Sequence, residues 1–538
     1  MDTPLLDGPD SFDHYSQHRR GTYFSKLKSK IKRLTRFRLF NLVPSLIIGL
    51  LISFLPPPQG ISKTGVTMFA VFFSTIFAII TSGYRISVVA SIAVCVLVLS
   101  NNLMCKTSDG LSVECHLCGT PISTSVASDT KVPVYLCKPT SSAFESILSG
   151  FSADIVWLIF SAFQIGKAVQ VSNLGKRIAL NIIYYLGRST LGIGYAIAGI
   201  EVILAMIIPS NSARGGGIVF PVVKSIISSI RSDDVLAAGI YKYITVVGAY
   251  SNTVSSTLFL TAMAGNPIIA LKAKEIFNID YNFSKWFIGA FFPMFLSLLT
   301  IPLICKLYFK PSFNVSEIRP KIIEDLSELK KISTKELKLI FVLVFCIIFW
   351  AGSTVFQISA SFVAFVATTL LILLDVLDWN DILGNTSAWD TIYWLAIFLS
   401  LAKQLSLLGI SSFIGRSLSS SLDGLPKFLS MTILSLVYYY STYLFSSTTS
   451  HVVALCGPFM EAAKHLGLNN LLFTAIITIS SSASAVLAPY CCGSIAIYAS
   501  MPYVELDEWF SIGFLFSLSQ IFLLLTIGTP YYYLIGWL

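Results

Sequence analysis

The stretch Met206-Ile-Ile-Pro-Ser-Asn-Ser-Ala-Arg-Gly-Gly-Gly217 decides the fold of this chain. It places a proline, two serines, an asparagine, an arginine and three glycines at the end of a long apolar run. Proline removes a backbone donor and glycine lowers helix propensity, so these residues interrupt a membrane helix. An interrupted backbone at membrane depth survives only where it is packed in protein or lines a polar cavity. The stretch therefore predicts a transporter whose substrate binds at this break.

The composition indicates a membrane protein along nearly the whole chain. Of 538 residues, 54% are hydrophobic and only 12% are charged, whereas a soluble domain carries about 25% charged residues. Since one span needs about 20 apolar residues, there is room for roughly ten to twelve spans. We expect an all-α polytopic protein. A phosphate-binding glycine loop, Gly-x-Ser-x-Gly and His-Glu-x-x-His are all missing, and there are five histidines; we therefore expect no enzyme and no cofactor.

The net charge of +9 points to membrane topology rather than to nucleic acid. Nine basic residues lie between Arg19 and Arg38, directly before the first apolar run. The positive-inside rule places this terminus in the cytosol, or in the equivalent compartment of an organelle. We expect a multi-pass integral protein of a plasma, vacuolar or organellar membrane, with the lipid bilayer as a partner.

The chain divides into two halves of similar style. Residues 1–38 form a basic cytosolic tail that we expect to be disordered, and residues 309–338 form a charged cytosolic linker. Residues 39–308 and 339–538 are the first and second repeat. Hydroxyl-rich segments recur in both, at Ser251–Thr257, Ser446–His451 and Ser480–Ser484. Such interruptions at corresponding places predict a site at the repeat interface; alternatively, these side chains bond one turn back along their helix and serve packing.

One long polar loop, residues 104–150, interrupts the first repeat. Counted from a cytosolic N-terminus, it lies on the exported side. It holds Cys105, Cys115, Cys118 and Cys137. Four cysteines in an exported loop favour two disulfides, with three connectivities open. Free thiols remain an alternative, as does a zinc site that uses Cys115-His-Leu-Cys118.

The sequence also resembles a known family. Ile208-Pro-Ser-Asn-Ser-Ala-Arg-Gly-Gly-Gly-Ile-Val-Phe-Pro221 resembles the signature of the divalent anion/sodium symporter family, in its branch of 2-oxoglutarate/malate translocators and citrate/succinate antiporters. Tyr443–Val452 resembles that branch's second hairpin. The resemblance runs from about residue 40 to the C-terminus. The chain departs from the family at Thr448, where the sodium-coupled branch has asparagine, and at Pro489–Ser494, where the antiporters have His-Tyr-Gly-Thr-Gly-Pro.

The resemblance implies a specific architecture and activity. The fold would have two inverted repeats with re-entrant hairpins, about 11 transmembrane helices, and a scaffold plus a mobile transport (elevator) domain in a homodimer. The carrier would exchange di- or tricarboxylates such as 2-oxoglutarate, malate or succinate by alternating access. A sodium-coupled dicarboxylate symporter is the first alternative, and an anion channel is the alternative from another class.

The resemblance also names the candidate site. Residues expected to bind the substrate lie at the two hairpin tips: Ser210, Asn211, Ser212, Arg214, Ser447, Thr448, Thr449 and His451. Unwound segments would complete the site with Ser251, Asn252, Thr253, Ser481 and Ser482. Hydroxyls, amide groups and helix N-termini donate hydrogen bonds without adding net charge. A sodium ion, if used, would lie near Asn211 and Thr448.

Arg214 and His451 each have two interpretations. Arg214 either binds a carboxylate through two hydrogen bonds of its guanidinium or extends to the membrane surface. His451 bonds either a carboxylate or a neighbouring helix. If Arg214 clamps the substrate, the empty carrier leaves a charge unpaired and reorients slowly. That penalty, together with Thr448, predicts an electroneutral dicarboxylate exchanger.

Overall fold

The computed structural model describes residues 38–120, 135–208, 210–230, 237–311 and 318–537. The predicted basic tail before residue 38 and Pro209 of the first motif lie outside these ranges. The described chain is almost entirely helical, as expected. Its one small sheet pairs β1 (Met104–Lys106) with β2 (Ser112–Glu114) in antiparallel register, with Cys105 opposite Val113.

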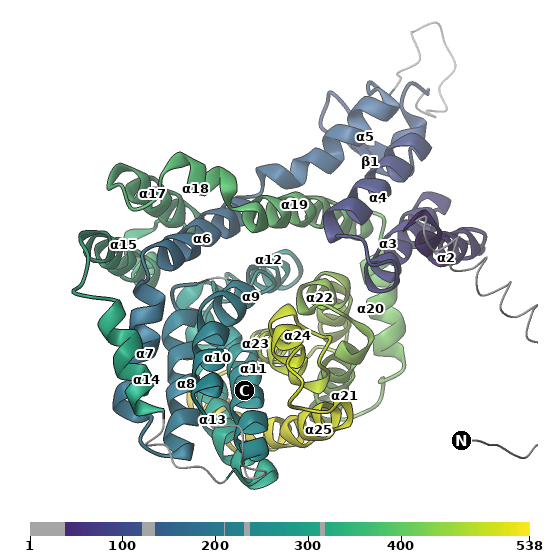
Figure 1. Ribbon diagram of the computed structural model, residues 1–538. Coiled ribbons are helices and arrows are strands. Elements are labelled where there is room, and N and C mark those ends of the chain that lie inside the picture. Colours follow the sequence, from purple (N-terminus) through teal and green to yellow (C-terminus); the bar gives the residue numbers. More distant parts are fainter. Residues whose placement is uncertain (1–37, 121–134, 209, 231–236, 312–317, 538) are drawn as a thin grey trace, which may run out of the picture.

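The helices form an outer arc around an inner body (Figure 1). The arc contains helices from both halves: α2 (Val43–Ser53), α3 (Lys63–Thr81), α4 (Ile86–Ser100), α5 (Pro139–Leu148), α6 (Asp154–Val171), α15 (Thr334–Ala351), α16 (Ser353–Phe356), α17 (Ala360–Leu373), α18 (Trp379–Gly384) and α19 (Thr386–Leu407). Two helices, α7 (Leu174–Leu186) and α20 (Ile410–Ser420), flank the body at opposite ends of the arc.

The inner body also draws on both halves. From the first it takes α8 (Thr190–Ala205), α9 (Asn211–Arg214), the π-helical turn η4 (Gly215–Val219), α10 (Phe220–Ser229), α11 (Ala237–Leu258), α12 (Asn266–Phe277) and α13 (Phe283–Phe309). From the second it takes α21 (Lys427–Tyr440), the turn η6 (Ser441–Leu444), α22 (Thr448–His465), α23 (Asn470–Ala483), the turn η7 (Ser484–Leu487), α24 (Gly493–Ala499), α25 (Leu506–Leu523), the π-helical turn η8 (Leu524–Gly528) and α26 (Thr529–Leu534).

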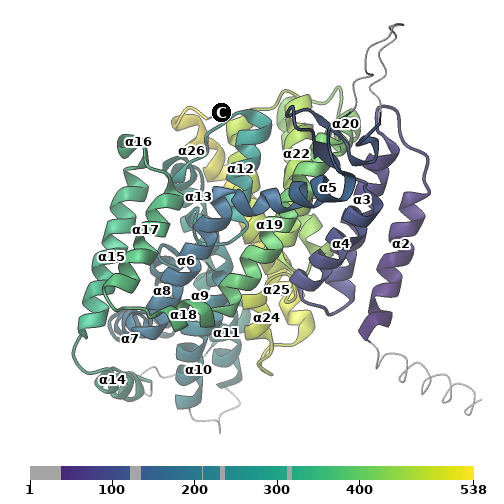
Figure 2. The same ribbon diagram turned by 90° about the horizontal axis from the view of Figure 1, so that it is seen from above.

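The two halves follow one helix order with opposite orientation. In each, a long arc helix is followed by a flanking helix, a hairpin and a helix that stops at an irregular segment: α6 to α11 in the first half, α19 to α23 in the second. Figure 2 shows α7 and α10 at one end of the molecule and α20 and α22 at the other. The first hairpin therefore enters from one face and the second from the opposite face.

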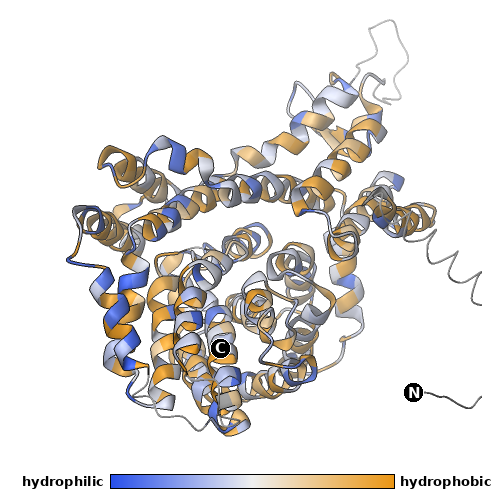
Figure 3. Cartoon of the chain, in the orientation of Figure 1, coloured by the Kyte–Doolittle hydropathy of each residue, from blue (hydrophilic) through white to orange (hydrophobic). Residues whose placement is uncertain are grey.

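Helix length and apolarity agree with a membrane protein. Five helices of the described chain are long and apolar enough to span a membrane, or six when the bent pair α19–α20 counts as one span. Four shorter apolar helices accompany them: residues 40–53, 86–100, 190–205 and 360–373. Hydrophobic residues dominate most helices in Figure 3, whereas α14 (Arg319–Glu328) is more hydrophilic.

One sequence-based expectation is wrong, that of the unwound segments. The hydroxyl-rich segments 251–257 and 480–484 are mostly helical rather than unwound: the irregular segments come later, at 259–265 and 484–492. The hydroxyls of Ser256 and Ser481 bond carbonyls one turn back along their own helix, so they find acceptors without an unwound backbone.

The described part of the loop 104–150 is folded onto the arc. Disulfides join Cys105 to Cys115 and Cys118 to Cys137. The Gln404 side chain of α19 accepts from the backbone N–H of Met104 at 2.7 Å and donates to its carbonyl at 3.0 Å. The loop is thus held by its two disulfides and by the hydrogen bonds between its first strand and Gln404.

The charged linker contains α14, which lies along α7. Arg177 of α7 donates to the carbonyls of Leu329 and Lys330 at 2.9 and 3.0 Å and pairs with Glu336 at 2.6 Å. Since Glu336 caps the start of α15 with Ser333, Arg177 holds the junction between the two halves.

Candidate functional site

Each hairpin tip contacts the irregular segment of the opposite half. At the first tip, Asn211 Nδ2 lies 3.2 Å from Cys492 Sγ in the segment before α24. A Cβ on Gly493 would lie only 2.9 Å from Ser212 Oγ, so the glycine permits this close approach. The first tip is therefore held by the second half.

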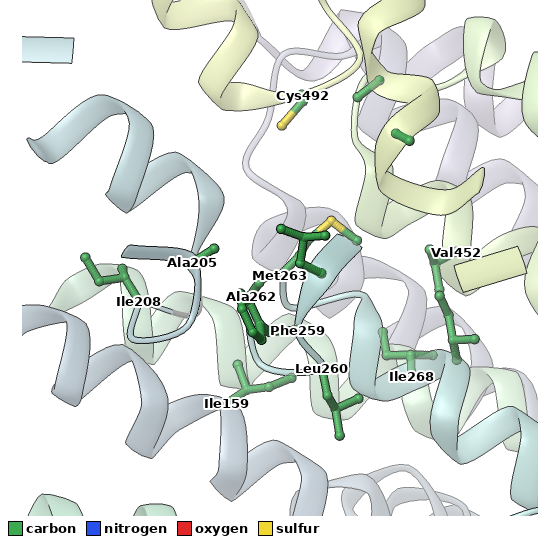
Figure 4. Packing of buried hydrophobic residues seen from close by; sticks show 14 of the residues in the cluster. Ile159, Ala205, Ile208, Phe259, Leu260, Ala262, Met263, Ile268, Val452 and Cys492 are labelled. Carbon is green, nitrogen blue, oxygen red and sulfur yellow. The ribbon is translucent and has the colours of Figure 1, made fainter. Parts of the chain in front are cut away.

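The second tip shows the mirror arrangement. Thr448 Oγ1 lies 3.5 Å from Met263 Sδ, in the segment that follows α11, and Gly265 lies close to the Thr449 backbone. Phe259, Ala262 and Met263 pack there among apolar side chains from neighbouring helices (Figure 4). Among the described residues no hydrogen bond joins the two tips directly, so the expected meeting of the tips takes the form of this crossed contact.

Both tips start helices inside the body. Ser210 caps α9 by accepting from the Ala213 N–H at 3.2 Å, and Ser447 caps α22 by accepting from the Ser450 N–H at 3.4 Å. Helix N-termini carry partial positive charge and free amide donors. Ser210, Ser212, Ser447 and Thr449 keep partial exposure, whereas Asn211 and Thr448 are buried. The tips thus offer hydrogen-bond donors that suit an anion.

α11 supports the first tip from behind, and α23 bonds to α11. Asn252 of α11 donates to the Asn211 carbonyl at 3.0 Å, and Ser482 of α23 donates to the Thr253 carbonyl at 2.9 Å. All the residues expected to line the site further are fully buried: Ser251, Asn252, Thr253, Ser481 and Ser482. Of these residues Asn252 bonds the first tip, and none lines an open surface.

Arg214 is fully buried and bonded entirely to protein. Its Nε pairs with Glu201 Oε2 at 2.7 Å. Its other N–H groups donate to the carbonyls of Ile208, Ala262 and Asn252 and to the hydroxyls of Ser255 and Ser256. Arg214 neither extends to the membrane surface nor offers a free donor to a carboxylate in this conformation. The expectation of an unpaired arginine in the empty carrier is therefore wrong, because Glu201 neutralises it.

Sequence reasoning missed Glu201. It lies in α8 inside a long apolar run, fully buried, and its Oε2 also accepts from Asn252 Nδ2 at 2.9 Å. A lone acid in a membrane helix is itself a signal of a functional or paired charge. Its partner lies 13 positions further along, beyond the helix end, so sequence periodicity does not reveal the pair.

His451 contacts its own hairpin. Its Nε2 lies 2.8 Å from Ser441 Oγ, and its ring packs between Tyr438 and Phe445 with centroids 4.5 and 5.1 Å away. Of its two interpretations, the structure shows the bond to a neighbouring helical segment. His451 thus stabilises the bend between α21 and the second tip.

Cys492 and Met263 were also not predicted as site residues. Both contact a tip through sulfur, and both lie in segments rich in glycine and proline, which was the available signal. Within the described ranges, no group of three or more His, Cys, Asp or Glu side chains is arranged to hold a metal ion. The Cys115-His-Leu-Cys118 segment instead contributes cysteines to both disulfides.

Comparison with known proteins assigns the family. The sodium:sulfate symporter transmembrane region matches residues 36–538, nearly the whole chain. The chain belongs to the sodium:sulfate symporter family. It is therefore a multi-pass membrane transporter and not an enzyme. The resemblance inferred from the two tip motifs is confirmed.

Several curated relatives of this family member cover almost its full length. A putative malate transporter of Bacillus subtilis, YflS, is 30% identical over 502 residues, which are 92% of this chain and 97% of the relative. The L-tartrate/succinate antiporter of Escherichia coli K12 is 29% identical over 491 residues, 90% of this chain and 96% of the relative. Among solved structures, the Alcanivorax borkumensis YdaH transporter aligns with a TM-score of 0.48 and 10% identity, over 82% of this chain and 98% of that one.

Proposed function

We propose that this transporter exchanges one dicarboxylate for another across its membrane, with 2-oxoglutarate, malate, succinate or tartrate as candidate substrates. The crossed contact of the two hairpin tips is the observation that carries the proposal. Each tip begins a helix, carries partly exposed hydroxyls and contacts the irregular segment of the other half. The names of the two relatives, a malate transporter and a tartrate/succinate antiporter, favour dicarboxylates.

The substrate-binding groups in this proposal are neutral. Ser210, Ser212, Ser447 and Thr449 would donate to the carboxylates together with the amides at the starts of α9 and α22. Asn211 would position the first tip. Burying a dicarboxylate is costly unless each oxygen finds a donor, and neutral donors allow release because no fixed ion pair must be broken.

Arg214 and Glu201 act as a neutral unit in this account. The pair adds no net charge to the site, so it neither attracts the dianion strongly nor repels a cation strongly. The pair anchors the first tip. Arg214 donates to the carbonyl of Ile208, which precedes the tip in the chain, at 3.1 Å, and to the carbonyl of Asn252, which lies behind the tip in α11, at 3.0 Å. We propose a positioning role for Arg214 rather than direct contact with substrate.

Alternating access follows from the two-part architecture. The inner body contains both tips and both irregular segments, so it can move as a unit against the arc. Gln170 of α6 in the arc donates to the Ala213 carbonyl of the body at 3.4 Å, a long hydrogen bond that such a motion would break. We propose in addition a homodimer built through the arc, to be tested by cross-linking in intact membranes.

Sodium-coupled symport is the second candidate function. The buried Asn252 Oδ1 has no hydrogen-bond donor among the described residues, and Asn252 contacts the first tip directly. A carbonyl oxygen in that position can ligate a hard cation. Because Glu201 neutralises Arg214, the arginine would not strongly repel a cation bound nearby.

Counterflow in proteoliposomes tests exchange against the anion-channel alternative. Vesicles loaded with unlabelled malate should take up labelled 2-oxoglutarate or succinate faster than empty vesicles. A channel would show no such acceleration. An equal rate in loaded and empty vesicles, for every dicarboxylate tried, would reject the exchanger.

A further inference from the structure

A crevice lies on the side of the inner body away from the arc. It is formed by α21, α23, α25 and the C-terminal segment η8–α26, and its empty space, including its open mouth, is about 660 Å³. In Figure 1, α21 and α25 lie on the side of the body opposite α6 and α19. The crevice belongs neither to the hairpin tips nor to the irregular segments that contact them.

The wall of this crevice is largely apolar, and the hydroxyl groups of its polar residues are used in hydrogen bonds within the protein. Thr432 and Ser435 donate to the carbonyls of Phe428 and Met431 at 2.8 and 2.6 Å, one turn back along α21. Tyr439 donates to Gln520, and Tyr532 donates to the Gly289 carbonyl at 2.6 Å. These hydroxyls already donate to protein acceptors, so a molecule in the crevice need not supply hydrogen-bond partners for them.

Exposed apolar side chains border the mouth of the crevice. Phe428 is 59% exposed and Leu525 is 43% exposed, and both line the crevice. They lie on helices of a transporter that spans the bilayer, so their exposed surface meets lipid rather than water. The π-helical turn η8, directly before Pro530, widens the C-terminal helix at the same place.

We propose that this crevice binds one acyl chain of a membrane lipid. An acyl chain fits the two observations together: it is apolar throughout, and it approaches from the side on which the crevice opens. A headgroup is not part of the proposal, because no charged side chain lines the crevice. The inference does not depend on what the protein transports.

An acyl chain in this crevice would contact α21 and α23, the helices that pack beside the second hairpin tip. Ser480 lines the crevice and precedes Ser481, which lies 2.9 Å from Tyr438 Oη on the inner side of α21. Tyr439 lines the crevice next to Tyr438. The acyl chain therefore packs on the outer side of α21 and α23, whose inner sides hold the second tip.

A photoactivatable lipid tests the proposal. The full-length protein is reconstituted in phosphatidylcholine vesicles that contain a lipid with a diazirine in one acyl chain, irradiated and mapped by peptide mass spectrometry. Wild-type adducts should concentrate in α21 and in residues 521–532. Ser435→Phe should fill the crevice and reduce these adducts about tenfold, which corresponds to displacing about two methylene groups.

Val437→Phe is the matched control, since Val437 is 50% exposed on the same helix and does not line the crevice. Its adducts should equal those of the wild type. Adducts spread evenly over all lipid-facing helices of the wild type would overturn the proposal, even if Ser435→Phe failed to fold. Equal adduct yields in the Ser435 and Val437 variants would overturn it as well.

Discussion

Arg214 and Glu201 form a salt bridge of 2.7 Å in which both side chains are completely buried. The pair joins α8 to the first hairpin tip, and Asn252 of α11 bonds the same carboxylate oxygen at 2.9 Å. Three elements thus meet at one charge pair behind the substrate-binding tip. A buried pair contributes little net stability, but removal of one partner leaves an uncompensated charge.

Loss of one charge of this pair should unfold the body. Glu201→Gln leaves Arg214 charged and buried, at a cost of about 3–5 kcal/mol. We expect a clear fall in the thermal-unfolding midpoint of the purified protein. The double variant Glu201→Gln/Arg214→Met should recover much of the loss, because it removes the charge that lacks a partner.

Glu508→Gln is the control for that experiment. Its partner Lys242 and Glu508 itself are partly exposed, at 25% and 22%, so the loss should be about 1 kcal/mol or less. Equal unfolding midpoints for Glu201→Gln and Glu508→Gln would show that Glu201 does not hold Arg214.

The first tip should depend on its asparagine. Asn211→Ala removes the carboxamide that reaches Cys492 and leaves buried partners unpaired, which costs about 1–3 kcal/mol. We predict a fall of about tenfold in exchange rate with normal membrane insertion. Ser228→Ala, an exposed change in α10, should leave the rate unchanged. If Asn211→Ala exchanges substrate at the wild-type rate, the first tip is not part of the substrate site.

The glycine opposite the first tip offers a finer test. In Gly493→Ala the new Cβ would lie 2.9 Å from Ser212 Oγ, so this hydroxyl must move. We expect weaker substrate binding, seen as a raised half-saturation concentration, without loss of folded protein. Gly384→Ala adds a Cβ with nothing within 4 Å and serves as the control. An unchanged half-saturation concentration in Gly493→Ala would argue that Ser212 does not bind substrate.

The disulfides of the loop 104–150 can be mapped directly. Non-reducing peptide analysis should give Cys105 joined to Cys115 and Cys118 joined to Cys137. The buried free cysteines, such as Cys305 and Cys456, should alkylate only after denaturation. Ready alkylation of all four loop cysteines in native, unreduced protein would contradict this pairing.

The starts of α9 and α22 could be predicted because their signals are local. Proline, glycine and Ser210 mark the start of α9, and a run of hydroxyl residues that includes Ser447 marks the start of α22. The sequence predicted the irregular segments poorly, because Ser256 and Ser481 bond back to their own helix instead of breaking it. The prolines and glycines at 265–267 and 489–493 were the better guide to where the helices end.

The role of Arg214 could not be predicted from the sequence. A charge next to a polar break fits a substrate clamp and a structural anchor equally well, and only the position of Glu201 distinguishes them. The disulfide pairing was open for a similar reason, since it depends on how β1 and α5 bring distant cysteines together. Long-range partners, rather than local conformation, were the missing information.

Exchange itself is the central claim, and one measurement tests it most directly. Labelled succinate uptake is followed in proteoliposomes that are either empty or loaded with unlabelled malate, each with and without an inward sodium gradient. The account predicts rapid uptake only into loaded vesicles, at a rate that sodium does not change. Robust uptake into empty vesicles driven by the sodium gradient alone would contradict it and establish symport instead.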